Sequence, residues 1–185
     1  MKTIYFVTGN MGKVKEAKAL GKEFNIEIQQ IKYEYPELQS DDLDTIAKYG
    51  AECASRVLNK AVIVEDAGLF ISALDGFPGP YSAYVFKTIG NEGILQLMAN
   101  QKDRRADFKS AVGYCEPGGE AIIFTGTVRG KIAHETRGEH GFGYDPIFLY
   151  DDKTFGELGI EGKNKVSHRY KALKKFVEWI GTKDI

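Results

Sequence analysis

The chain has 185 residues, of which 43% are hydrophobic and 12% aromatic, and this composition excludes an intrinsically disordered protein. Its 25 basic and 26 acidic residues give a formal net charge of −1, so it lacks the general basic character of a nucleic-acid binder. At roughly 150 residues per domain, the length predicts one domain over residues 1–185, in one or two lobes.

The first six residues after Met1 (KTIYFV) predict a strand, because β-branched and aromatic side chains dominate them. A turn at residues 8–10 precedes a predicted helix over residues 11–23. The helix has one apolar face, formed by Val14, Ala17, Leu20 and Gly21. A half-buried second strand follows, in which isoleucines alternate with polar residues over 26–31.

An acidic loop over residues 33–42 separates this strand from a helix that we expect Asp44 to cap and that ends near Leu58. The apolar run at residues 61–64 predicts a short strand buried on both faces. We expect this strand to end at Glu65 and Asp66.

The second half of the chain mixes hairpins and helices. The expected elements are a Gly/Pro-rich loop at 75–81, a helix at 91–100, strands at 108–116 and 121–128, a continuation of that sheet at 131–134, and a helix from Ser167 to about Ile180. Together these elements predict an α/β fold with a mixed, twisted sheet flanked by helices.

Neither cysteine nor histidine spacing supports a metal or nucleophilic site. Cys53 and Cys115 form no CxxC motif, and the histidines at 134, 140 and 168 have no zinc-binding spacing. Two reduced thiols are typical of a cytoplasmic protein. No apolar run approaches the roughly 18 residues of a membrane span, so we expect no membrane partner.

The turn at residues 8–13 (Thr-Gly-Asn-Met-Gly-Lys) lies between a predicted strand and a predicted helix. Free N–H groups at a helix start, together with Lys13, can hold phosphate. The segment matches neither the GxxxxGK[ST] nor the GxGxxG pattern, and an ordinary turn is the alternative interpretation.

Acidic residues at the end of the buried strand are the second candidate. One of Glu65 and Asp66 can face a ligand at the carboxyl end of the sheet, where it can bind Mg²⁺ or accept a proton. Glu37, in the acidic loop, can supply a further oxygen ligand. Solvent-exposed acids are the alternative interpretation for all three.

Two later motifs complete the candidates. Residues 142–146 (Phe-Gly-Tyr-Asp-Pro) can present Phe142 for stacking on a nucleobase and Asp145 for hydrogen bonds, or form a core aromatic beside a turn. Residues 163–169 (Lys-Asn-Lys-Val-Ser-His-Arg) place cations at the start of the last predicted helix. Because the helix dipole disfavours cations there, this segment indicates an anionic partner, or a solvated basic turn.

Taken together, these motifs resemble the inosine triphosphate pyrophosphatases, which hydrolyse non-standard purine nucleoside triphosphates. The resemblance covers nearly the whole chain and is greatest to archaeal members. The motifs are TGNMGK (8–13), PEL (36–38), EDAGL (65–69), GFPGPYSA (76–83), FGYDPIF (142–148) and KNKVSHR (163–169). The family fold is an elongated α/β protein with two lobes around a central nucleotide-binding cleft, usually a homodimer.

The resemblance implies a role for each matching position. Glu37 and Asp66 match Mg²⁺ ligands, and Asp66 also matches the proposed general base. Lys13 and Lys48 match lysines that contact the phosphates. The other implied substrate-binding residues are Thr8, Gly9, Asn10, Met11, Gly12, Ala67, Phe142, Gly143, Tyr144, Asp145, Lys163, His168 and Arg169.

The implied reaction is attack of water on the α-phosphorus, which yields a nucleoside monophosphate and pyrophosphate. Asp66 would activate the water, Mg²⁺ would polarise the phosphates, and the two lysines would stabilise the leaving group. Many relatives carry serine where this chain has Ala67, so only a backbone contact is expected there.

Base selection also has a physical interpretation. Arg169 carries only donors, which match the O6 and N7 acceptors of hypoxanthine and xanthine and oppose the amino group of adenine. Guanine shares both acceptors, so Arg169 alone does not exclude it.

Other functions remain open at this point. A pyrophosphatase for other modified nucleotides would keep all the motifs, whereas a non-catalytic nucleotide-binding module would need no acid at Asp66. A nucleic-acid binder would use the basic stretch 163–175, against which the near-neutral net charge argues. We therefore expect an enzyme that binds a purine nucleoside triphosphate, and no nucleic acid.

Overall fold

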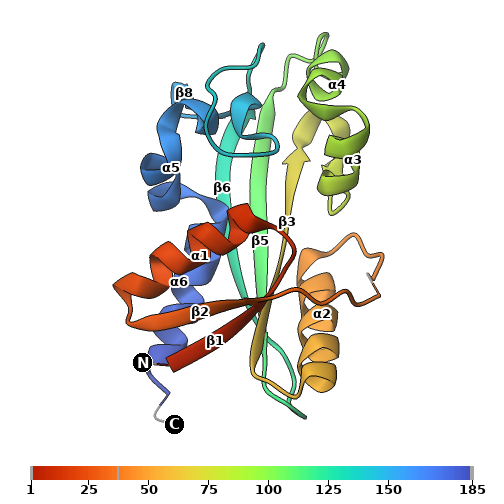
Figure 1. Cartoon of the computed structure of the whole chain (residues 1–185). Coiled ribbons are helices and arrows are strands. Elements are labelled where there is room, and N and C mark those ends of the chain that lie inside the picture. The colour runs from red at the N-terminus through yellow and green to blue at the C-terminus, as the bar shows by residue number, and fades with distance from the viewer. Residues whose placement is uncertain (1, 37, 184–185) are drawn as a thin grey trace. The chain divides into compact units, whose positions relative to one another are not determined.

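The computed structural model describes residues 2–36 and 38–183, whose strands form one eight-stranded mixed sheet flanked by helices (Figure 1). The strand order is β2-β1-β3-β5-β6-β7-β8, and β4 pairs with β3. The strands are β1 Lys2–Val7, β2 Ile26–Ile31, β3 Val62–Ile71, β4 Pro78–Gly79, β5 Arg105–Cys115, β6 Ile122–Ile132, β7 Phe148–Tyr150 and β8 Lys153–Thr154. The helices are α1 Met11–Glu23, α2 Leu43–Leu58, α3 Ser82–Thr88, α4 Gly90–Leu97, α5 Phe155–Val166 and α6 His168–Gly181, with short 3-10 turns at Ser72–Leu74 and Asp145–Ile147.

The sheet is mixed because its first strands are parallel and its outer ones are antiparallel. β1 pairs in parallel with β2 and with β3, whereas the β3–β4, β6–β7 and β7–β8 pairs are antiparallel. This arrangement confirms the predicted α/β class with a mixed sheet. Within the described part of the chain, no helix has the length and apolar character needed to cross a membrane.

The chain divides into two compact units. Unit 1 comprises residues 1–66, 110–126 and 169–185, and unit 2 comprises residues 67–109 and 127–168. β3, β5 and β6 contribute residues to both units.

Unit 1 is a three-layer arrangement. Ala17 and Leu20 of α1 and Phe176 of α6 pack in one cluster with Phe6 of β1 and Ile63 of β3. A second cluster joins the small side chains of α2 to neighbouring strand residues that point the other way, and it contains Val7, Ala51, Ala54, Val62, Val64 and Cys115. Because side chains alternate along a strand, α1 and α6 cover one face of β3 and α2 covers the other. Figure 1 shows these helices on opposite sides of β1 and β3.

Unit 2 is built around aromatic side chains. Phe108 of β5 lies 4.5 Å from Phe148 and 5.9 Å from Phe155, measured between ring centroids. Arg104 donates hydrogen bonds to the backbone carbonyls of Met98, Ile132 and Ala133, which ties the end of α4 to the end of β6. Both contacts fix the frame that carries the loop after β6.

Several predicted elements are confirmed at their predicted positions. They are the strand at 2–7, the helix at 11–23 with its buried face, and the strand at 26–31. The hairpin turn at 117–119 also lies where it was expected, although β5 begins earlier and β6 ends later than the predicted strands.

Two predicted boundaries were wrong. Asp42, and not Asp44, caps α2, because its carboxylate accepts hydrogen bonds from the backbone N–H groups of Asp44 and Thr45. β3 does not end at Glu65 and Asp66 but continues to Ile71. The two acids therefore lie in the middle of a strand rather than at its carboxyl end.

Two helices were not predicted. α3 follows the Gly/Pro-rich loop, and α5 spans residues that include Gly156, Gly159 and Gly162. Gly159 has non-helical dihedral angles (φ 69°, ψ 175°), so α5 is kinked there. Glycine disfavours a helix interior, which hid this element in the sequence.

Candidate functional site

The turn at residues 8–13 is fixed by side-chain capping. Asn10 Oδ1 accepts hydrogen bonds from the backbone N–H of Gly12 at 2.8 Å and of Lys13 at 3.2 Å, and Thr8 Oγ1 accepts from the N–H of Asn10. Asn10 is exposed, and Gly9 has no atom near the position of a Cβ. The capped turn thus leaves open space beside its backbone.

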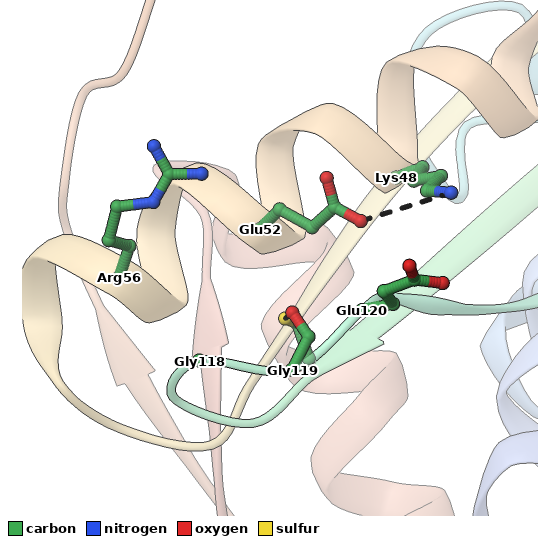
Figure 2. Close-up of a pocket in the computed structure, with 7 residues that line it drawn as sticks. Lys48, Glu52, Arg56, Gly118, Gly119 and Glu120 are labelled. Atoms are coloured by element: carbon green, nitrogen blue, oxygen red, sulfur yellow. Dashed lines mark hydrogen bonds and ion pairs between the residues drawn. The ribbon is translucent and has the colours of Figure 1, made fainter.

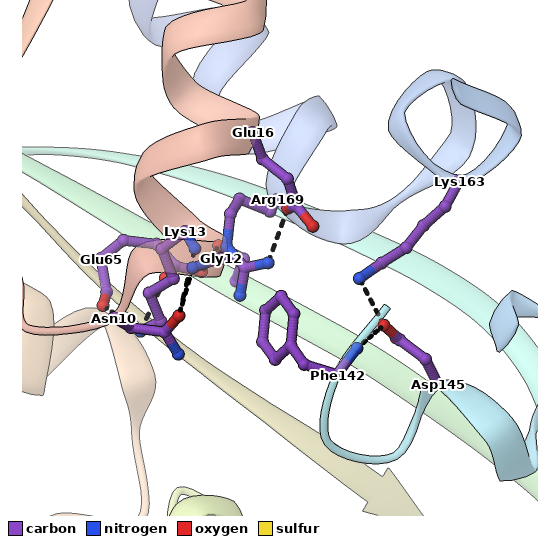
Figure 3. A network of polar contacts seen from close by, with 10 residues as sticks. Asn10, Gly12, Lys13, Glu16, Glu65, Phe142, Asp145, Lys163 and Arg169 are labelled. Carbon is purple, nitrogen blue, oxygen red and sulfur yellow. Dashed lines mark hydrogen bonds and ion pairs between the residues drawn. The ribbon is translucent and has the colours of Figure 1, made fainter. Parts of the chain in front are cut away.

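Lys13 is the first basic side chain of this turn, and it turns back onto β3. Its Nζ donates to the backbone carbonyl of Glu65 at 2.8 Å and lies 2.8 Å from Glu65 Oε2. The Lys13 side chain is 18% exposed, whereas that of Glu65 is fully buried. Lys13 therefore reaches from α1 to the strand that carries both acids (Figure 3).

The Glu65 carboxylate is surrounded by donors. Oε1 accepts a hydrogen bond from Ser110 Oγ at 2.7 Å and from Arg169 Nε at 3.1 Å. Burial alone would raise the pKa of the Glu65 carboxyl, but the charges of Arg169 and Lys13 together outweigh that effect and hold the pKa well below its usual range. Glu65 therefore remains ionised in the core.

Arg169, at the start of α6, is held by a second carboxylate. Its Nη1 donates to Glu16 Oε2 at 2.7 Å, so its Nε and Nη1 atoms each contact an acid (Figure 3). Arg169 is therefore held by two carboxylates at the start of α6.

The basic segment at 163–169 is divided between two helices. Lys163 and Lys165 lie in the last turn of α5, where the helix dipole favours cations. Only Arg169 stands near the start of a helix, and there Glu16 and Glu65 compensate its charge. The prediction that all these cations crowd a helix N-terminus was wrong.

Asp66 faces away from this network. Successive strand residues point to opposite faces, so Asp66 shares the α2 face with Val64, whereas Glu65 points toward α1 and α6. Asp66 is partly exposed. The two acids therefore point to opposite faces of β3, as the sequence predicts for adjacent strand residues.

Asp66 is the described residue that was predicted to bind a magnesium ion. Among residues 2–36 and 38–183 there is no group of three or more His, Cys, Asp or Glu residues that could hold a metal ion. Glu37, the other predicted ligand, lies outside the described residues. Mg²⁺ commonly takes one or two carboxylates and completes its shell with water and substrate phosphates, so a partly exposed Asp66 fits such an ion.

Lys48 lies on α2, the helix that covers the Asp66 face. It borders a pocket of about 370 Å³, and Figure 2 shows the side chains that line it. The lining residues are Lys48, Glu52, Arg56, Cys115, Gly118, Gly119 and Glu120. Lys48 Nζ lies 4.0 Å from Glu52, whose carboxylate also accepts the N–H of Ala121. With two cations and two acids, this pocket has no anion-binding character of its own.

In unit 2, the loop after β6 carries the second group of predicted residues. Asp145 Oδ2 accepts hydrogen bonds from the backbone N–H of Phe142 at 2.8 Å and from Lys163 Nζ at 2.7 Å (Figure 3). The same Nζ lies 4.6 Å from the centre of the Phe142 ring. Lys163 thus holds both the acid and the aromatic side chain of the loop.

The loop is also tied to the helices of unit 2. Tyr144 donates its hydroxyl hydrogen to the backbone carbonyl of Ser82 at 2.8 Å, and Asn91 Nδ2 donates to the carbonyl of Gly143 at 3.1 Å. Gly143 has a φ of 63°, which favours glycine. The loop is therefore held from α3 and α4 as well as from α5.

His168 and Ala67 complete the predicted residues of unit 2. The His168 imidazole is buried and stacks on Phe108 with a centroid distance of 4.6 Å. Ala67 is partly exposed and directly follows Asp66 on β3.

The sequence marked Glu65 only as an alternative to Asp66, and it gave Glu16, Ser110 and Asn91 no place in either group. The sequence did contain a sign that Glu65 is paired. An acidic side chain that lies on the buried face of an apolar strand requires a cationic partner. No comparable local signal marked the other three.

The chain belongs to the Ham1 family, whose model matches residues 4–179. It is 59% identical over 178 residues to a protein of Methanopyrus kandleri named dITP/XTP pyrophosphatase, with 95% of each chain covered. A Pyrococcus horikoshii protein of the same name is 50% identical, with 96% of each chain covered.

Solved structures support the same assignment. A Ham1 protein from Staphylococcus aureus is 34% identical and superposes with a TM-score of 0.84, with 97% of this chain and 98% of that chain covered. A HAM1 protein from Coxiella burnetii is 27% identical with a TM-score of 0.87 and the same coverage. The resemblance expected from the six motifs is thereby confirmed.

Proposed function

We propose that the chain hydrolyses non-standard purine nucleoside triphosphates (dITP, ITP and XTP) to the nucleoside monophosphate and pyrophosphate. The observation that carries this proposal is the full-length 59% identity to a protein named dITP/XTP pyrophosphatase. The chemistry is hydrolysis of a phosphoanhydride bond, and its role is to remove abnormal nucleotides from the cytoplasmic pool.

The phosphate-binding role belongs to residues of unit 1. The turn from Thr8 to Lys13 offers open space beside capped backbone, and Lys13 supplies positive charge there. Lys48 is exposed on α2 and contributes a second cation. These lysines stabilise the charge that grows on the departing pyrophosphate.

Asp66 is the general base of this proposal. Its carboxylate orients the attacking water and accepts its proton, while the α-phosphorus receives the water oxygen. Asp66, with Glu37, would hold a Mg²⁺ ion, which when bound would supply positive charge that polarises the phosphate oxygens. The neighbouring Glu65 is unsuitable for either role, because Lys13, Ser110 and Arg169 already occupy its oxygens.

The base-binding role belongs mainly to unit 2. Phe142 supplies an aromatic face for stacking, and Asp145 accepts hydrogen bonds from base N–H groups. Lys163 keeps both in place. The remaining contacts that we propose are Gly143, Tyr144, His168, Ala67 and Arg169.

The experiment that tests this proposal measures pyrophosphate release from dITP, ITP, XTP, GTP and ATP, each with Mg²⁺ and with EDTA. Metal-dependent release from the first three, far above ATP, supports the assignment. Nucleotide binding without release from any of them would indicate a non-catalytic module instead. Light scattering during size-exclusion chromatography tests the accompanying proposal that the enzyme is a homodimer.

A further inference from the structure

Glu65 is a buried acid of unit 1 with several charged and polar partners, although no role in substrate or metal binding falls to it. Its side chain is fully buried, and three side chains from three different elements meet it: Lys13 from α1, Ser110 from β5 and Arg169 from α6. Burying a carboxylate is costly unless charge and hydrogen bonds compensate it. Two cations and a hydroxyl group directed at one buried carboxylate indicate that the carboxylate itself is needed.

Lys13 contacts Glu65 at two places, the backbone carbonyl and the side-chain carboxylate. Nζ donates to the Glu65 backbone carbonyl and also lies 2.8 Å from Glu65 Oε2. One of the three N–H donors of the ammonium group is taken by this carbonyl, and the charge of the carboxylate keeps Nζ beside Oε2. Because the side chain of Lys13 is 18% exposed, an N–H donor that is not used by Glu65 can reach a phosphate oxygen.

The other carboxylate oxygen of Glu65, Oε1, is held by residues other than Lys13. Arg169 Nε and Ser110 Oγ both contact Oε1, and Glu16 holds Arg169 in turn. The carboxylate therefore cannot follow Lys13 if the lysine moves. The carboxylate thus holds the end of the Lys13 side chain in a fixed position relative to the core.

We propose that Glu65 is a positioning residue that fixes the Lys13 ammonium for contact with the triphosphate. This inference rests on the proposed function, because it assigns Lys13 to the departing phosphates. A misplaced catalytic group can lose about 100-fold in rate, so orientation alone is a sufficient reason for a buried acid here.

The first test is a double-mutant cycle on kcat for dITP hydrolysis, using Glu65→Gln, Lys13→Met and the double variant. We expect Glu65→Gln to lower kcat at least ~10-fold while KM rises less than ~3-fold, because the cations that attract phosphate remain. In the Lys13→Met background the same change should cost less than ~2-fold. Glu16→Gln removes a carboxylate that contacts Arg169 but not Lys13, and it should change kcat less than ~3-fold.

Losses that multiply in the double variant, or an equal loss in Glu16→Gln, would show that Glu65 only stabilises the fold. Thermal unfolding of each variant sets an assay temperature at which all are folded. Should Glu65→Gln not fold, Glu65→Asp keeps the charge and shortens the reach to Lys13, and the same cycle applies to it.

The second test does not depend on turnover. The ¹⁵Nζ–¹H signal of Lys13, assigned by its loss in Lys13→Met, should be rigid in the parent protein and mobile or exchange-broadened in Glu65→Gln. An equally rigid signal in both would overturn the inference. If the parent protein releases no pyrophosphate from any nucleotide, the proposed function fails, and the NMR comparison still decides whether Glu65 positions Lys13.

Discussion

Lys163 and Asp145 form an ion pair of 2.7 Å whose side chains are only 4% and 3% exposed. Removing one partner of such a pair leaves an uncompensated buried charge. We expect Lys163→Met to lower the free energy of unfolding by about 3–5 kcal/mol, which urea denaturation measures. The double variant Lys163→Met/Asp145→Asn should recover much of the stability without restoring dITP hydrolysis. Recovery of both would remove the two residues from substrate binding.

Gly141 and Gly143 form a matched pair for testing the loop. Both have positive φ, 82° and 63°, but a Cβ at Gly141 would collide with Asp145 Oδ2, whereas a Cβ at Gly143 meets nothing within 4 Å. Gly143→Ala should therefore lower the free energy of unfolding by only about 1 kcal/mol of backbone strain, and it keeps the backbone groups through which residue 143 would contact the substrate. Gly141→Ala should also raise the KM for dITP, by about 10-fold, because it displaces the acid that holds Phe142. Equal KM values in the two variants would contradict this.

Asp66→Asn tests the general base. The variant should keep its circular dichroism spectrum and lose at least about 100-fold in kcat for dITP, since the amide cannot accept the proton. Asp107→Asn, at a partly buried aspartate of β5, is the matched control and should retain activity. Near-normal turnover of Asp66→Asn would exclude the assigned role.

Arg169→Lys tests base selection. Lysine keeps the positive charge but lacks the planar set of donors that contacts Glu65 and Glu16 at once. We expect the ratio of kcat/KM for ITP over ATP to fall at least about 10-fold. Glu16→Gln changes a partner of the same guanidinium and serves as the control. An unchanged ratio in Arg169→Lys would mean that other residues recognise the purine.

The cap of α2 predicts a pH dependence of stability. The hydroxyl of Thr45 donates to the Asp42 carboxylate and is the main reason that its pKa lies below the usual value. The charged cap therefore stabilises the fold above about pH 4, and this contribution is lost as the pH falls through the lowered pKa. The melting temperature should fall less between pH 5 and pH 2 in Asp42→Asn than in the parent protein, whereas Asp42→Ala should cost about 1 kcal/mol at pH 7. Parallel curves for the parent protein and Asp42→Asn would contradict the assignment.

Local patterns were sufficient for the first three elements of the chain. The helix at 11–23 was predicted with its buried face because Val14, Ala17 and Leu20 recur at helical spacing. The acidic residues in β3 were misjudged for a non-local reason. Glu65 fits inside the strand only because Lys13 and Arg169 neutralise it, and Arg169 is 104 residues away in sequence.

In the candidate site, too, local patterns could be predicted from the sequence and long-range contacts could not. Short motifs marked the turn at 8–13 and the loop at 142–146, but the contacts that hold them are long-range. Lys163 was expected at the start of a helix and lies instead at the end of α5, where it reaches Asp145. Asn91 is 52 residues from the carbonyl that it binds, so no spacing rule could associate it with the loop.

The division of the chain has a consequence for its engineering. Unit 1 consists of three separate stretches of sequence and unit 2 of two, so the chain passes between them at 66/67, 109/110, 126/127 and 168/169. Neither unit corresponds to a continuous piece of a gene. No terminal truncation can therefore release either unit intact. Exchange of unit 2 between relatives would require replacing both of its stretches together.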